Sequence, residues 1–200
     1  MSATKKIVIT IAVGLTMTAI GLLFSYWINT QPVWVSINMI VDRDLLPTIP
    51  VQNIQIINFV ETHGQELAPD YEGTVCTEFV IKVIEKFKNL TQEEKQLIRI
   101  ITTEQLDSLI IMDAPIIKGV QTAIIKGGKG IEIDKFKDVK PGDFVQFWNL
   151  FKDKEYGHCG IVLEIVPNES ITVYSSHPVT NGYGKHKFLW PDKIYFARLE

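Results

Sequence analysis

An uncharged segment over residues 7–29 sets the tightest limit on how this chain can fold. At about 1.5 Å per residue it makes a helix about 34 Å long, enough to cross a hydrocarbon core of about 30 Å. Lys5 and Lys6 precede it, and no basic residue follows before Arg43. This asymmetry places the amino-terminal tail, residues 1–6, in the cytoplasm and the rest of the chain outside. We therefore expect a single-pass protein of the cell membrane, with its domain on the periplasmic or outer side.

A cleavable secretory signal peptide is the alternative, because it also begins with charge and continues with an apolar run. The run is long for the apolar core of a signal peptide. No Ala-x-Ala-like cleavage site follows it in Ser25–Asn29, where Tyr26 and Trp27 suit a membrane interface. We expect an uncleaved signal anchor, and whether the segment is cleaved stays open.

The charge of the chain argues against a nucleic-acid partner. Residues 31–200 hold 18 Lys and Arg against 23 Asp and Glu, since only Lys5 and Lys6 of the 20 basic residues lie before them. Binding nucleic acid needs clustered basic side chains that contact phosphates. Acidic residues interrupt the most basic stretch, residues 118–140, so we interpret it as a solvated face. The sequence leaves the oligomeric state open.

Residues 30–51 contain three prolines and predict a connector, followed by one domain over residues 52–200. Apolar residues at helical spacing dominate the first half of the domain. Thr74 is positioned to cap one of these helices, and Thr91 with Glu94 forms the pattern of a capping box. Helices are expected from Val51 to about Gly64, from Val75 to about Lys88, after Thr91, near Thr103, and over Pro115–Gly127.

After Gly128 the apolar residues alternate as in strands. Pro141 and Gly142 predict a type II turn that begins the first strand. Helices followed by a meander of strands indicate an α+β domain with an antiparallel sheet. Strands are expected over 144–148, 158–166, 171–177 and 193–199.

Cys76 lies in the first turn of the helix expected from Val75. Unpaired backbone N–H groups and the positive end of the helix dipole favour a thiolate there, and the thiolate is the nucleophilic form. A buried core cysteine is the alternative. The only other cysteine is Cys159. Two cysteines are few for a small exported domain held together by disulfides, although one bridge between them remains possible.

His158 is the expected base. Side chains alternate along 157–165, so Cys159, Ile161, Leu163 and Ile165 share an apolar face and Cys159 is expected in the core. His158 points to the opposite face, next to two glycines that leave space above the strand. An imidazole there can reach a sulfur packed across the sheet, as a Cys–His pair requires.

A third residue should orient the imidazole. Ser175 and His177 share one face of the following strand, and either can bond the second ring nitrogen; we prefer His177, whose ring reaches further. A zinc site of Cys76, His158 and His177 would have three ligands at most. We expect no metal and no other cofactor.

Four segments in this order resemble the NlpC-type and CHAP cysteine peptidases of bacterial cell walls. They are Val75–Val80 around the cysteine, Val139–Trp148 with its Pro-Gly-Asp turn, Gly157–Val162 with the base, and Val173–His177 with the third residue. Tyr71 lies near a position where a family tyrosine lines the active site. The resemblance implies a papain-like domain in which Cys76 and His158 hydrolyse amide bonds of peptidoglycan stem peptides.

Two features bear on this resemblance. The cysteine precedes the histidine, whereas circularly permuted relatives that act on lipid acyl chains have the reverse order. The stretch Leu90–Gly128 is longer than the corresponding family loop. The alternative function is a membrane-tethered binding module that keeps the papain-like fold without activity. The sequence does not decide which amide bond is cleaved, or in whose wall.

Overall fold

The structure, a computed structural model, describes residues 48–151 and 154–200. The expected cytoplasmic tail, membrane anchor and most of the connector lie outside the described residues. Within the described part of the chain, no helix combines the length and apolar character needed to span a bilayer.

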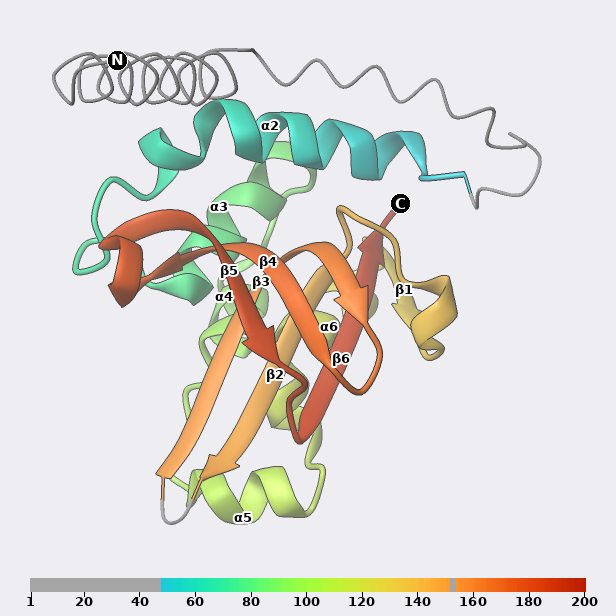
Figure 1. Ribbon diagram of the computed structural model, residues 1–200. Helices are drawn as coiled ribbons and strands as arrows, with labels where there is room; N and C mark the ends of the chain where they lie inside the picture. The colour runs from blue at the N-terminus through green and yellow to red at the C-terminus, as the bar shows by residue number, and fades with distance from the viewer. Residues whose placement is uncertain (1–47, 152–153) are drawn as a thin grey trace, which may run out of the picture. The chain divides into compact units, whose positions relative to one another are not determined.

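Six antiparallel strands form one sheet in the spatial order β1-β6-β2-β3-β4-β5 (Figure 1). The central strands β2 and β3 form a long hairpin in which Gln146 pairs with Cys159 and Phe147 with His158. The strands are β1 Gly130–Ile133, β2 Phe144–Phe151, β3 Lys154–Val166, β4 Ser170–His177, β5 Gly182–Leu189 and β6 Lys193–Leu199.

Helices pack on one face of this sheet, and three of them, α3, α4 and α6, lie behind it in Figure 1. The main core lies between them and the sheet, where Phe79, Ile84 and Ile124 meet Phe144 and Ile161. This arrangement confirms the α+β class with an antiparallel sheet. The helices are α2 Val51–Leu67, α3 Cys76–Phe87, α4 Gln92–Arg99, α5 Leu106–Ile111 and α6 Gly119–Lys126, with short 3-10 turns η1 Pro115–Lys118, η2 Phe136–Asp138 and η3 Pro178–Thr180.

The helix ends agree with the sequence in one case and differ in two. The capping box of α4 is present, with Thr91 and Glu94 bonding each other's backbone N–H. The expected cap by Thr74 is wrong: α3 begins at Cys76, and its N-cap residue is Val75, whose side chain has no polar atom. The Thr74 hydroxyl instead accepts a bond from Lys82 Nζ at 3.0 Å. Helix α2 continues past Gly64 to Leu67.

All four expected strands form, and the structure adds two more. Strands β1 and β5 lie at the two edges of the sheet. The sequence of β5, Gly-Tyr-Gly-Lys-His-Lys-Phe-Leu, carries little apolar alternation, and its backbone pairs with β4 over its full length. Edge strands need backbone pairing more than a buried face, so hydrophobic patterning misses them.

The alternation expected along β3 holds only up to a register shift between Val162 and Glu164. Cys159 and Ile161 join the helix-side core as expected. Ile165 instead packs with Val162 and Phe147 on the other face, because the shift inserts one residue and reverses the following side chains. The expected turn before β2 forms, with Gly142 at φ +89°, as the third residue of a type II turn requires.

Candidate active site

Contacts on both sides hold the amino-terminal end of α3, where Cys76 is the first residue. The Ser176 hydroxyl of β4 donates to the backbone carbonyl of Thr74, just before the helix. On the other side the Arg99 guanidinium, at the end of α4, binds the Glu78 carboxylate through two nitrogens. A bidentate pair of this kind sets orientation as well as distance. The first turn of α3 is thus tied to the sheet and to the next helix.

Strands β3 and β4 separate beside this helix end. Their pairing runs from Ile161 with Tyr174 to Val166 with Ser170. At Gly160, next to the last paired residue, the two strands are still too close for a side chain, since a Cβ there would lie 2.6 Å from the Tyr174 carbonyl oxygen. Towards the start of β3 the edge is open, and there Cys76 lines one cavity together with His158 and Cys159. Cys76 therefore sits at the strand edge, within reach of both sheet faces.

The surroundings of Cys76 favour its thiolate. Hydrogen bonding from the Cys159 thiol lowers the pKa of Cys76 most, and a hydrogen bond and positive charge from His158 lower it further. Burial opposes these contributions, yet the pKa stays well below its usual value. Its position as the first residue of α3 adds the positive end of the helix dipole. The arrangement favours the thiolate, which is the nucleophilic form of cysteine.

His158 connects Cys76 to β4. It is 3% exposed, and its Nε2 shares a hydrogen bond with Ser175 Oγ at 2.8 Å. Because Ser175 occupies Nε2, Nδ1 is the ring nitrogen available to Cys76. Phe147 and Phe188 pack around the imidazole, with ring centroids 5.7 and 5.0 Å away. These contacts hold the ring in one orientation.

His177 lies beside His158 but bonds elsewhere. The two ring centroids are 5.3 Å apart, edge to face. Nδ1 of His177 accepts a bond from the Val179 backbone N–H, and Nε2 bonds the Tyr156 hydroxyl at 3.0 Å. Of the two alternatives for the third residue, Ser175 therefore makes the hydrogen bond to His158, and His177 packs against it.

Tyr71 lies close enough to the cysteine to feel its charge. Burial raises the pKa of the Tyr71 phenol, and the negative charge of Cys76 raises it further. The structure thus brings all five residues expected at the site, Tyr71, Cys76, His158, Ser175 and His177, into one neighbourhood.

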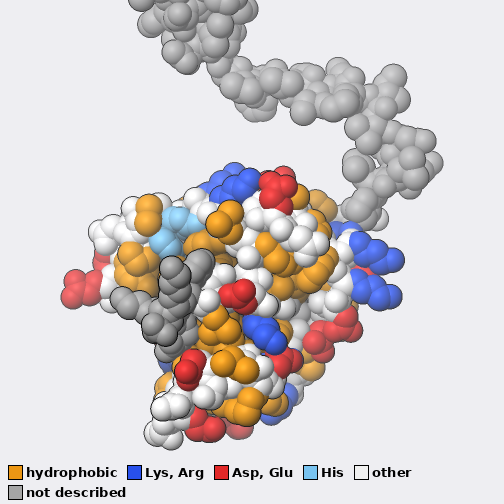
Figure 2. Space-filling model, turned by 60° about the horizontal axis from the view of Figure 1, so that its bottom comes forward, with side chains coloured by type: hydrophobic (Ala, Val, Ile, Leu, Met, Phe, Trp, Pro, Cys, Tyr) orange, Lys and Arg blue, Asp and Glu red, His pale blue; other side chains and the backbone are white. Residues whose placement is uncertain are grey.

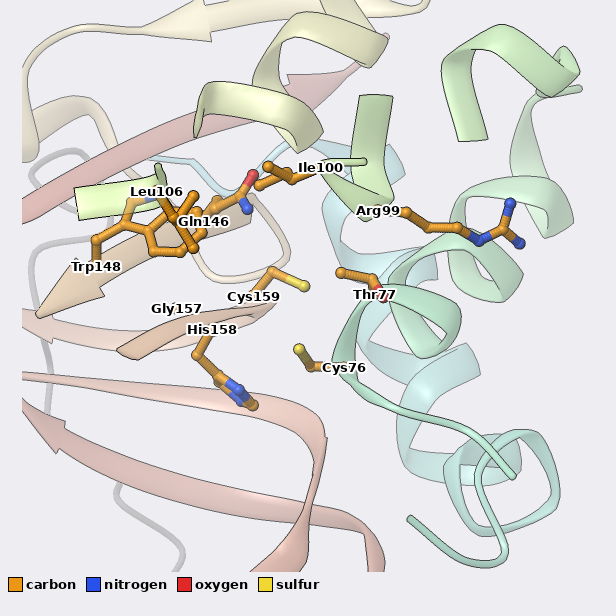
Figure 3. Close-up of a pocket in the computed structure, with 10 residues that line it drawn as sticks. All are labelled: Cys76, Thr77, Arg99, Ile100, Leu106, Gln146, Trp148, Gly157, His158 and Cys159. Carbon is orange, nitrogen blue, oxygen red and sulfur yellow. The ribbon is translucent and has the colours of Figure 1, made fainter. Parts of the chain in front are cut away.

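A cavity of about 180 Å³ opens from Cys76 on the helix side of the sheet (Figure 3). Ile100, Leu106 and Trp148 make its walls largely apolar. The Trp148 indole N–H donates to the Ile117 carbonyl at 2.9 Å, which fixes one wall against the segment between α5 and α6. The long stretch Leu90–Gly128 thus builds one side of the cavity.

Gln146 is a site residue that sequence reasoning missed. Its Oε1 accepts the Val120 backbone N–H at 3.0 Å, so its other terminal atom must be the amide nitrogen. Among the described residues that nitrogen has no hydrogen-bond partner, and Gln146 lines the cavity next to Cys159, its partner across the β2–β3 ladder. The available signal was a lone amide in the apolar strand 144–148.

The described residues contain no group of three or more His, Cys, Asp or Glu side chains arranged to hold a metal ion. In the zinc site considered from the sequence, both ring nitrogens of His177 already form hydrogen bonds, with Val179 and with Tyr156.

On the face of the molecule drawn in Figure 2, acidic and basic side chains are interspersed.

Comparisons of this chain with protein-family models, with curated proteins and with solved structures find no significant match.

Proposed function

We propose that this chain is a membrane-anchored, papain-like cysteine hydrolase that cleaves amide bonds of peptidoglycan. The observation that carries the proposal is the array of Cys76, His158 and Ser175 at the mouth of a cavity. A helix-start thiolate, an imidazole beside it and a buried hydroxyl behind the imidazole are the parts of a nucleophile–base–orienter triad.

The proposed reaction begins with attack of the Cys76 sulfur on the substrate carbonyl carbon. The negative oxygen that forms needs donors aimed at it. The backbone N–H of Cys76, at the unpaired start of α3, is one donor, and the Gln146 amide is the second. His158 protonates the leaving amine. It then takes a proton from water, which attacks the thioester and releases the acid.

The substrate class rests on the shape of the cavity and on the family resemblance. Arg99 is the cationic side chain among the cavity residues, and Glu78 already neutralises it. Apart from Cys76 and His158 themselves, the remaining lining is uncharged, so the cavity suits a small neutral side chain next to the scissile amide. Peptidoglycan as the target follows from the resemblance of the four segments, together with the expected position of the domain outside the membrane.

The test uses the full-length chain solubilised in mild detergent and incubated with purified peptidoglycan. We expect soluble fragments whose masses identify the cleaved amide, and none with Cys76→Ala prepared in parallel. Intact peptidoglycan after incubation with folded wild-type protein would rule the activity out. A reporter that works only outside the cytoplasm, fused after Glu200, should be active; an inactive one would overturn both the topology and the wall substrate.

An inactive papain-like binding module is the second candidate, favoured by the near-complete burial of His158. Iodoacetamide separates the two candidates, because only an accessible thiolate is alkylated at neutral pH. Rapid labelling of Cys76 supports the enzyme. An inert Cys76 in protein that still binds peptidoglycan supports the module.

A further inference from the structure

The only two cysteines of the chain, 83 positions apart in sequence, meet at the same cavity wall. Both are free thiols. Cys76 is partly exposed and packs against the core residue Cys159, which is fully buried. In Figure 3 the two sulfur atoms point towards one another, from the start of α3 and from the helix-facing side of β3.

The hydrolytic reaction proposed above uses one of these sulfurs and leaves the other without a role. A buried cysteine in an apolar core is ordinary by itself. Contact with a nucleophilic thiolate changes its chemistry, because thiol–disulfide exchange needs a second sulfur within reach of the first. The two sulfur atoms, which face one another in Figure 3 at a cavity wall that both cysteines line, meet that condition.

The two thiols differ in a way that sets the order of reaction. The pKa of Cys76 is lowered, so it is the sulfur that reacts first with an external oxidant. The pKa of Cys159 is raised, first by its hydrogen bond to Cys76 and then by burial and the charge of Cys76. Modification of Cys76 removes that negative charge, so Cys159 becomes more acidic at the moment when its attack is required.

We propose that Cys76 is a site of reversible oxidation by small disulfides, with Cys159 as the resolving thiol that closes a Cys76–Cys159 disulfide. The Cys76 thiolate attacks one sulfur of the small disulfide; a mixed disulfide forms, the original S–S bond breaks, and a thiolate leaves. That thiolate takes the proton of Cys159. The Cys159 sulfur then attacks the Cys76 sulfur and expels the second small thiolate, which takes a proton from water. Two protein thiols are oxidised, and one small disulfide is reduced to two thiols.

The consequence for catalysis rests on the proposed function. A disulfide consumes the nucleophile, so the oxidised protein is inactive until a reductant restores both thiols. Disulfides persist in the extracytoplasmic compartments where the domain is expected. The internal partner would protect Cys76 from irreversible oxidation, because an unresolved sulfenic acid can proceed to sulfinic and sulfonic acids.

The test is the mass of the full-length chain in detergent after incubation with oxidised glutathione. Wild type should lose two hydrogen atoms, carry no glutathione, and yield one digest fragment in which the Cys76 and Cys159 peptides are joined. Dithiothreitol should reverse the change. The Cys159→Ala variant, checked for folding by circular dichroism, should instead retain glutathione on Cys76. If that variant does not fold, the peptide map of the wild-type protein alone decides whether the Cys76–Cys159 disulfide forms.

A stable glutathione adduct on wild-type Cys76, or unmodified thiols throughout, overturns the proposal. These results are measured by mass spectrometry and require no hydrolysis of peptidoglycan. A failure of this proposal can therefore be distinguished from a failure of the proposed hydrolase function. If peptidoglycan cleavage is detected, the fraction of activity lost should equal the fraction of disulfide. Activity that persists in fully disulfide-linked protein would contradict the regulatory consequence.

Discussion

Replacing Ser175 by alanine should slow the proposed hydrolysis more than replacing His177 by alanine. Ser175 Oγ is buried and holds His158 Nε2 at 2.8 Å. Its loss leaves that ring nitrogen without a partner on the buried side of the imidazole, away from the cavity. During the reaction His158 carries a positive charge, and a hydrogen bond to a charged group is worth about 1.5–3 kcal/mol. Since about 1.4 kcal/mol corresponds to a factor of ten, kcat/KM should fall about 10- to 150-fold.

His177 touches His158 through ring packing alone, with centroids 5.3 Å apart. Edge-to-face packing of rings is worth about 0.5–1.5 kcal/mol. His177→Ala should therefore reduce kcat/KM about two- to tenfold. The assay is the initial rate of fragment release from peptidoglycan, measured over a range of substrate concentrations.

Ser170→Ala is the matched control, because Ser170 is a buried serine on the same strand, β4, at the end away from His158. It shows what the loss of a buried hydroxyl costs in stability, and thermal unfolding of all three variants is measured in parallel. A Ser175→Ala enzyme with the wild-type rate, or a greater loss in His177→Ala, would refute the assignment of Ser175 as the orienting residue.

Three further predictions concern the same region. Cys76→Ala and His158→Ala should each abolish nearly all turnover, and the double variant should be no worse than either, because the pair acts as one unit; additive losses in the hydrolysis assay would contradict this. Gln146→Leu should lower kcat about 10²–10³-fold with KM little changed, if its amide binds the oxyanion; a change confined to KM would make it a binding residue. Burial, followed by the positive charges of His177 and His158, lowers the pKa of His186 from 6.5 to about 4. The unfolded chain therefore binds a proton there before the folded one, and stability should decrease as the pH falls from about 6.5 towards 4, less so in His186→Asn, as thermal unfolding can measure.

The local structure around the candidate nucleophile could be predicted from sequence because it depends on neighbours in the chain. The apolar spacing of 79–87 defines the buried face of α3, and Thr91 with Glu94 marks the start of α4. The Pro-Gly pair before β2 determines a turn through its own backbone preferences. The same reasoning placed His158 and Cys159 on opposite faces of one strand, as the structure has them.

The partners of these residues depended on register and on packing between distant segments, which local patterns do not contain. Ser175 and His177 share a strand face, and only the divergence of β4 from β3 decides which of them bonds His158. Strand alternation placed Cys159 in the core, on the face opposite to His158, and left open whether it meets Cys76. Alternation describes the faces of a strand but not its open edge, and at that edge Cys76 lies beside both Cys159 and His158. The proposed nucleophile and base were thus visible in the sequence, whereas the tertiary structure decided which groups surround and orient them.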